Sequence, residues 1–387
     1  MRIKTQIFRI FAAAAVVLLA ALPARAQSPN NAGIVVIVTD QTGLPVADAS
    51  VTVTNEQTAA SREVMTSTSG SASLAALSLT GMYTVTVSKS GFADEARSGI
   101  RLESGEVATL RVKLVIAGAE SDVTVYGTEE GARADAQIGL TLDSEQIDET
   151  PVLGRKITYL PLLNSAFRQG KGTGDLFVNA TYFIAGAGSR RATSFMVDGA
   201  SNDDGWGRQT MLTTLPIGAV EEAAVLTNAF SAEYGWTSGP VFNVVTKSGT
   251  NALRGEALYL ARPGGLQAES FSTDGFCAPS VDTCVTPDTL DAINPADNPD
   301  ELNQFSATIG GPIVRDRTFF FLSGDYTHED RTTYLPDRLP AFVLPADGSL
   351  EYVGHYRQKL IDARVDHKLT PSQTLMVRAN YDYFKDM

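Results

Sequence analysis

The 387 residues are enough for two or three domains, each with its own hydrophobic core. The formal charge is -13 at pH 7, and this acidity argues against nucleic acid as a partner. Beyond the N-terminus no apolar run is long enough for a transmembrane helix, so any membrane span must be built from strands.

The first 26 residues have the three parts of a secretory signal. Basic residues precede the apolar run Ile10 to Leu22, and Ala24-Arg25-Ala26 is a small-residue cleavage site. We therefore expect an exported protein whose mature chain begins near Gln27. An N-terminal membrane anchor is the alternative, but the apolar run is short for a span.

Residues 27–115 predict a seven-strand β-sandwich, because short Val- and Thr-rich runs alternate with turn residues. Asp40 to Gly43, followed by Pro45, predicts a hairpin-like reversal. The clearest strands are Gly33 to Thr39, Ser50 to Asn55, Met82 to Ser88 and Val107 to Val115.

This segment resembles the carboxypeptidase regulatory-like domain. The resemblance implies no enzymatic activity, because the region lacks the His and Glu set of a zinc site. It rests on Gly33 through Gly43, Pro45, Ala49-Ser50-Val51, Gly81 to Val85 and Ser90-Gly91-Phe92.

Residues 116–137 have the composition of an exposed linker. Inside it, Asp122-Val123-Thr124-Val125-Tyr126-Gly127 is a β-prone segment that can add itself as a strand to a partner's sheet edge. It resembles the TonB box, which implies the TonB-type energising complex of the inner membrane as a partner. An ordinary strand between two domains is the alternative.

Residues 138–251 have a mixed α/β pattern and predict a compact domain. Asp143 or Ser144 is placed to cap a short helix, which Pro151 ends. Ser194 to Val197 predicts a strand, and Ile217 to Val225 predicts a helix.

Three motifs of this segment occur in the order typical of the plug domain of TonB-dependent receptors, and they resemble the Oar-like group in particular. They are Phe195 to Gly199, Ala232 to Gly235 and Val241 to Asn251. The resemblance implies a plug inside an outer-membrane β-barrel.

Residues 252–387 alternate apolar and polar side chains with period two, as a barrel wall between lipid and a wet lumen requires. Phe320 to Thr327 and Ile361 to Asp366 both follow this pattern. In the clearest run, one face carries Leu375, Val377, Ala379, Tyr381 and Tyr383, and the other carries Met376, Arg378, Asn380 and Asp382. A soluble antiparallel sandwich with one wet face is the alternative.

Connection lengths support the barrel, because long and short connections alternate between the strands. Phe305 to Phe321, with Ile309 to Ile313 followed by Asp316 to Phe321, also resembles the start of an Oar-type barrel. We expect about five strands. Because an open sheet of five strands would leave unpaired edges in lipid, we also expect the sequence to be a fragment or a truncated product. The expected strands are Arg254 to Ala261, Gln304 to Pro312, Thr318 to Thr327, Gly354 to Lys368 and Leu375 to Tyr383.

Few residues are candidates for a site. Cys277 and Cys284 are expected to form a disulfide in the first external loop. Asp198, Asp203 and Asp204 lack the spacing of a Ca²⁺ loop, and a polar turn is the favoured interpretation. The candidate ligand contacts on plug loops, with a solvated loop as the alternative, are Arg190, Arg191, Asp203, Asp204 and Trp206.

The sequence thus predicts a mostly β protein: a small sandwich, an α/β plug and the first strands of an antiparallel outer-membrane barrel. The resemblance implies a TonB-dependent receptor for energy-coupled uptake of an extracellular ligand, surrounded by outer-membrane lipid and with its sandwich and linker in the periplasm. No catalytic, cofactor or metal site is predicted. An adhesion protein that uses the sandwich as its binding head and a signal-transducing receptor are the alternatives.

Overall fold

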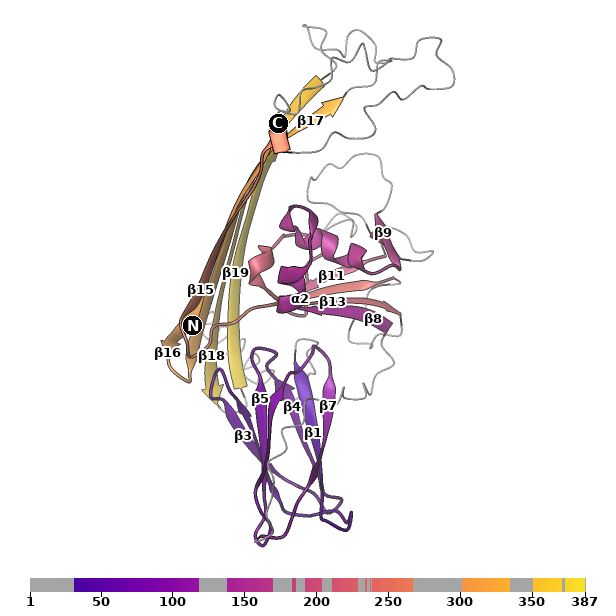
Figure 1. Cartoon of the computed structure of the whole chain (residues 1–387), viewed down its shortest axis with the longest axis vertical. Helices are drawn as coiled ribbons and strands as arrows, with labels where there is room; N and C mark the ends of the chain where they lie inside the picture. Colours follow the sequence, from indigo (N-terminus) through magenta and orange to yellow (C-terminus); the bar gives the residue numbers. More distant parts are fainter. Residues whose placement is uncertain are drawn as a thin grey trace, which may run out of the picture.

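The computed structural model describes residues 31–117, 138–169, 183–185, 192–203, 211–228, 234, 237, 239–266, 301–334, 351–370 and 373–386. Three bodies follow one another: a sandwich, a central domain, and a sheet of long strands beside the central domain (Figure 1). This confirms the predicted fold class. Among the described residues, no helix is long and apolar enough to cross a membrane.

The sandwich consists of two sheets, ordered β4-β1-β7 and β3-β2-β5-β6. Alternate residues point into the space between the sheets, so Val36 of one sheet and Val51 and Val85 of the other are fully buried. The strands are β1 Ala32–Thr39, β2 Ser50–Asn55, β3 Ser61–Met65, β4 Ser71–Leu77, β5 Tyr83–Ser88, β6 Glu95–Ile100 and β7 Val107–Lys113.

The turn after β1 forms, but it does not join a hairpin. Asp40 Oδ1 accepts hydrogen bonds from the backbone N–H groups of Thr42 at 2.8 Å and Leu44 at 2.9 Å, and the bond from the Thr42 hydroxyl holds the Asp40 pKa below its usual value. Because β4 and β7 already occupy both edges of β1, the chain crosses to the other sheet.

The central domain contains a five-stranded sheet ordered β12-β11-β14-β13-β8. The predicted helix is confirmed, and a capping box between Asp143 and Gln146 begins it. The elements are β8 Ile138–Asp143, α2 Ser144–Glu149, η1 Leu153–Arg155, η2 Ile157–Leu163, β9 Phe167–Gln169, β10 Phe183–Ala185, β11 Ser194–Val197, β12 Ala200–Ser201, η3 Ile217–Ala219, β13 Val220–Asn228 and β14 Val241–Thr246.

The helix predicted for Ile217 to Val225 is wrong, since only the short turn η3 is helical and strand β13 follows it. β13 lies between β14 and β8, where Ala223 and Val225 are fully buried. A strand covered on both faces loses its alternation, and periodicity then does not separate it from a helix.

The third body is an antiparallel meander ordered β15-β16-β17-β18-β19, called the wall below. Its strands are longer than predicted, but long connections at 263–300 and 335–350 alternate with short ones at 315–317 and 371–372. They are β15 Arg254–Arg262, followed by the turn η5 Gly264–Leu266, β16 Glu301–Val314, β17 Thr318–Tyr334, β18 Glu351–Thr370 and β19 Gln373–Asp386.

The two faces of the wall differ as the alternation predicts. Leu322 and Val377 are exposed on the outer face. Asp362 and Asp366, by contrast, are buried on the inner face, where the wall faces the central domain (Figure 1). The polar face predicted to line a wet lumen therefore packs on the central domain.

Candidate functional site

The best-built polar site lies where the central domain meets the wall. Asp198 follows β11 directly and has a left-handed backbone (φ 48), as does Gly199 (φ 71), so the chain turns sharply there. The Asp198 carboxylate reaches the neighbouring strand and accepts hydrogen bonds from the Thr246 N–H at 2.9 Å and the Thr246 hydroxyl at 2.8 Å. These bonds fix the carboxylate at the edge of the sheet.

Two arginines of the wall contact this carboxylate. Arg364 of β18 and Arg378 of β19 are register partners on the inner face. Arg378 Nε lies 3.1 Å from Asp198 Oδ2, and Arg364 Nη1 lies 3.7 Å from Asp198 Oδ1. The Asp198 side chain is only 4% exposed, so solvent screens these ion pairs weakly.

Asp366 completes the group. Its two oxygens accept from Arg364 Nε at 2.8 Å and Arg364 Nη2 at 3.0 Å, the fork geometry of a strong arginine pair. The Ser248 hydroxyl of the central domain donates to Asp366 Oδ2 at 2.6 Å. We call Asp198, Arg364, Asp366 and Arg378 the ion cluster.

Asp362 lies beside the ion cluster on the inner face. It is fully buried, and its Oδ1 lies 3.8 Å from Arg378 Nη1. Neither of its oxygens accepts a hydrogen bond from a described residue. Since a buried carboxylate without hydrogen bonds is costly, its attraction to Arg378 is the main interaction that offsets this cost.

Close backbone packing accompanies these charges. A Cβ on Gly249 would lie 2.7 Å from the Gly311 carbonyl oxygen of β16 and would also collide with Phe320, so only glycine fits there. The Thr214 N–H donates to Asp382 Oδ2 of β19 at 3.0 Å. The central domain is thus held against the wall at several heights.

The sandwich touches both other bodies. Val245 of β14 is buried in the hydrophobic core of the sandwich. Glu222 accepts from the Ser104 N–H at 3.1 Å, and Arg101 forms a 3.1 Å salt bridge with Asp143. Burial beside this junction raises the pKa of Glu221. The positive charges of Lys247 and Arg101 lower that pKa and so offset part of the rise.

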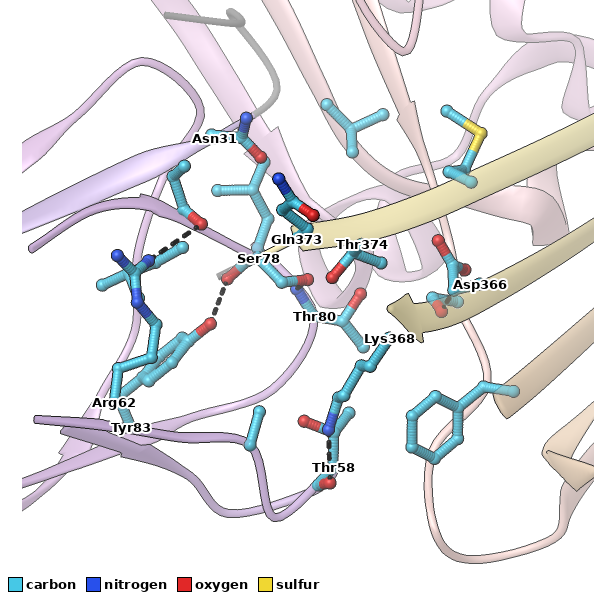
Figure 2. A pocket seen from close by; sticks show the side chains of 18 of the residues that line it. Asn31, Thr58, Arg62, Ser78, Thr80, Tyr83, Asp366, Lys368, Gln373 and Thr374 are labelled. Carbon is cyan, nitrogen blue, oxygen red and sulfur yellow. Dashed lines mark hydrogen bonds between the residues drawn. The ribbon is translucent and has the colours of Figure 1, made fainter. Parts of the chain in front are cut away.

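A cavity of about 480 Å³ lies where the three bodies meet. Figure 2 shows two hydrogen bonds in its polar lining: Lys368 Nζ donates to the Thr58 carbonyl at 3.0 Å, and the Tyr83 hydroxyl donates to the Ser78 carbonyl at 2.8 Å. Burial raises the pKa of Tyr83. The cavity thus lies at the junction between the three bodies.

Of the predicted ligand contacts, only Asp203 lies in the described part of the chain. It accepts from the Phe195 N–H at 2.7 Å and stabilises the turn after β12. The segment Asp122 to Gly127, the pair Cys277 and Cys284, and the residues Arg190, Arg191, Asp204 and Trp206 lie outside the described residues.

Sequence reasoning missed the ion cluster. It assigned Arg364, Asp366 and Arg378 to the polar face of the strands and Asp198 to a turn. The strand pattern does not indicate that Asp198 contacts these residues. A signal was present nonetheless, because charges on inner-face positions of neighbouring strands need partners when a domain fills the barrel.

The matches to known families cover two parts of the chain. Residues 33–115 match the model of the carboxypeptidase regulatory-like domain, and residues 245–342 match that of the outer membrane beta barrel domain. The chain therefore contains a carboxypeptidase regulatory-like domain and, after the central domain, part of an outer membrane beta barrel domain. This pairing places the protein in the Gram-negative outer membrane.

The chain is also homologous to the TonB-dependent transporter Oar of Myxococcus xanthus. The two are 27% identical over 303 residues, which are 76% of this chain and 26% of the relative. The chain therefore spans about a quarter of the length of the curated relative it matches.

Two solved structures align with part of the chain. The transporter YddB of Escherichia coli superimposes with a TM-score of 0.46 and 12% identity, covering 64% of this chain and 33% of YddB. The siderophore receptor PirA of Pseudomonas aeruginosa gives a TM-score of 0.40 and 18% identity, and the alignment covers 64% of this chain and 34% of PirA.

Proposed function

We propose that this chain is the N-terminal part of a TonB-dependent transporter, in which the central domain is a plug that closes the barrel. The observation that carries the proposal is the ion cluster. Asp198 of the central domain is bound by Arg364 and Arg378 of the wall, in a site that little water reaches. A domain held in this way blocks passage until the cluster opens.

The position of Asp362 supports a cluster that opens and closes. When Asp198 leaves, Arg378 still has Asp362 3.8 Å away on its own wall. The wall therefore keeps a partner for its arginine, which lowers the cost of breaking the contact. A buried carboxylate without hydrogen bonds is otherwise hard to explain in a static wall.

Energy input completes the mechanism. The segment Asp122 to Gly127 is proposed to pair as a strand with the periplasmic end of a TonB-type complex, and force on it is transmitted to β8 of the central domain. No covalent chemistry is part of this function. The extracellular ligand is bound by loops and by the candidate contacts Arg190, Arg191, Asp204 and Trp206.

The adhesion alternative fits less well. A binding head must project into the medium, whereas the sandwich here packs against Val245 of the central domain and Lys368 of the wall. These contacts lie at the short-connection end of the strands, which faces the periplasm in outer-membrane barrels.

A reversible cross-link between plug and wall tests the proposal. Gly218 of the central domain lies close to Thr308 of β16, because a Cβ on Gly218 would lie 2.9 Å from the methyl group of Thr308. Cysteines at these two positions can therefore form a disulfide. In cells producing the full-length protein, the probe is a large hydrophilic antibiotic that enters through the opened barrel. Asp198→Ala should increase entry, but only when the TonB-type complex is present.

The double variant Gly218→Cys with Thr308→Cys, placed in the Asp198→Ala background, should lose this entry when oxidised and regain it when reduced. Each single cysteine variant is the matched control and should not respond to oxidation. If entry is the same in the oxidised and reduced double variant, the central domain is not the gate.

A further inference from the structure

The outer face of the wall carries a row of aromatic residues across neighbouring strands. Tyr259 pairs with Phe305, Phe305 with Tyr326, and Tyr326 with Lys359, which in turn pairs with Tyr383. All four rings are more than a third exposed, and those of Tyr259 and Phe305 lie 4.5 Å apart. Aromatic rings at one height on a barrel mark a membrane interface.

The height of this row identifies the leaflet. Eight residues of β17 separate Thr318, at the short connection, from Tyr326. At about 3.3 Å per residue this is roughly 26 Å along the strand, and a tilt of about 40° makes it about 20 Å of height, most of the apolar band of about 25 Å. Since short connections face the periplasm, the row lies on the outer-leaflet side of the band, toward its interface.

Basic residues lie directly beyond the aromatic row. The next outward positions are Asn303, His328, Arg357 and Lys385, which are register partners of one another. Arg357 and His355 contact Asp330 at 2.8 and 3.0 Å. Among the described residues, Lys359 in the aromatic row and Lys385 in the row beyond it have no ion-pair partner, so two neighbouring cations are free to meet an anion.

Directly below the aromatic row the outer face is hollowed. Ala257, Ala307 and Gly324 lie side by side in the row under the aromatic one, and their small side chains leave a groove of about 600 Å³. Tyr259, Phe305, Tyr326 and Lys359 border it. A Cβ on Gly324 would meet no atom closer than 3.9 Å, so packing of the wall does not require glycine there.

We propose that this surface binds a lipid of the outer leaflet whose phosphate headgroup has a net negative charge. Its acyl chain lies in the groove over Gly324, and its phosphate meets Lys359, Lys385 and the adjoining Arg357. An apolar groove ending at cations matches an amphiphile with an anionic headgroup, because chain burial and charge pairing occur together only in such a molecule. The proposal rests on the outer-membrane location and not on the transport function.

The test uses the full-length protein reconstituted in vesicles of phosphatidylcholine with or without phosphatidic acid. Lipids that remain bound after transfer to an uncharged detergent are identified by native mass spectrometry. The wild type should retain phosphatidic acid in preference to phosphatidylcholine. Lys359→Gln and Lys385→Gln should each weaken retention about fivefold, the effect of one basic residue near an anionic surface.

Gly324→Leu should also reduce retention, because it fills the groove and changes no charge. Lys113→Gln, on an exposed position of the sandwich, is the matched control and should behave as the wild type. Equal retention of both lipids, or equal retention by all variants, overturns the proposal. If inorganic phosphate alone competes as well as phosphatidic acid, the site recognises free phosphate and the lipid assignment is wrong.

Discussion

Arg378 Nε of the wall lies 3.1 Å from Asp198 Oδ2 of the central domain, although 180 residues separate the two in the sequence. Both side chains are largely buried, at 18% and 4% exposure. Removing Asp198 takes from Arg378 its nearest carboxylate in a buried site, while Asp362 and Asp366 on the wall still offset part of the arginine charge.

Asp198→Ala should therefore weaken the attachment of the central domain by about 1.5 to 3 kcal/mol, less than the cost of leaving a buried charge with no partner. The measurement is hydrogen exchange of the β11 and β14 amides, which should lose protection. Asp148→Ala is the control, because Asp148 is 44% exposed and its bridges to Arg155 and Lys247 each span 3.9 Å. If Asp148→Ala changed the stability of the attachment by more than about 1 kcal/mol, the loss in Asp198→Ala could not be assigned to the burial of its ion pair.

Gly249→Ala should destabilise the contact between central domain and wall, since its Cβ would lie 2.7 Å from the Gly311 carbonyl oxygen. Overpacking of this kind costs about 1 to 3 kcal/mol. The thermal unfolding midpoint of the full-length protein should fall. Gly324→Ala has room for its methyl group and should leave the midpoint unchanged, so equal shifts in both variants would contradict the packing argument.

Glu221 should make the sandwich junction sensitive to pH. Because burial raises its folded-state pKa above the unfolded value, its contribution to stability is fully present below the unfolded pKa. That contribution is lost as pH rises through the folded pKa. The neighbouring charges are Lys247, Arg101, Arg364 and Asp143.

Glu221→Gln should consequently raise the unfolding midpoint at neutral pH, and the gain over the wild type should vanish in acid below the unfolded pKa. Melting curves across this pH range provide the measurement. A gain that is the same at every pH would assign the effect to packing and not to ionisation.

Val245→Ala should loosen the sandwich from the central domain, because this side chain lies in the sandwich core. The loss of its buried methyl groups costs about 2 kcal/mol. Calorimetry of the full-length protein should then resolve a separate sandwich transition. Val107→Ala, at a position 39% exposed, serves as the control, and a similar change there would contradict the docking role of Val245.

The sequence alone determined what depends on local spacing. The cap at Asp143, the sandwich strands and the alternation of β17 to β19 follow from residue type and period, and each is present in the structure. Boundaries of the wall strands were less predictable, because β-pairing continues beyond the alternating core into polar segments.

Only the tertiary structure decided which polar groups meet. Strand periodicity placed Arg364 and Arg378 on the inner face, but their partner Asp198 comes from a turn in another domain, and no local pattern joins the two. The same reason explains β13, whose strand form depends on β8 and β14 on either side. Periodicity determines the face of a residue, and long-range packing determines its partner.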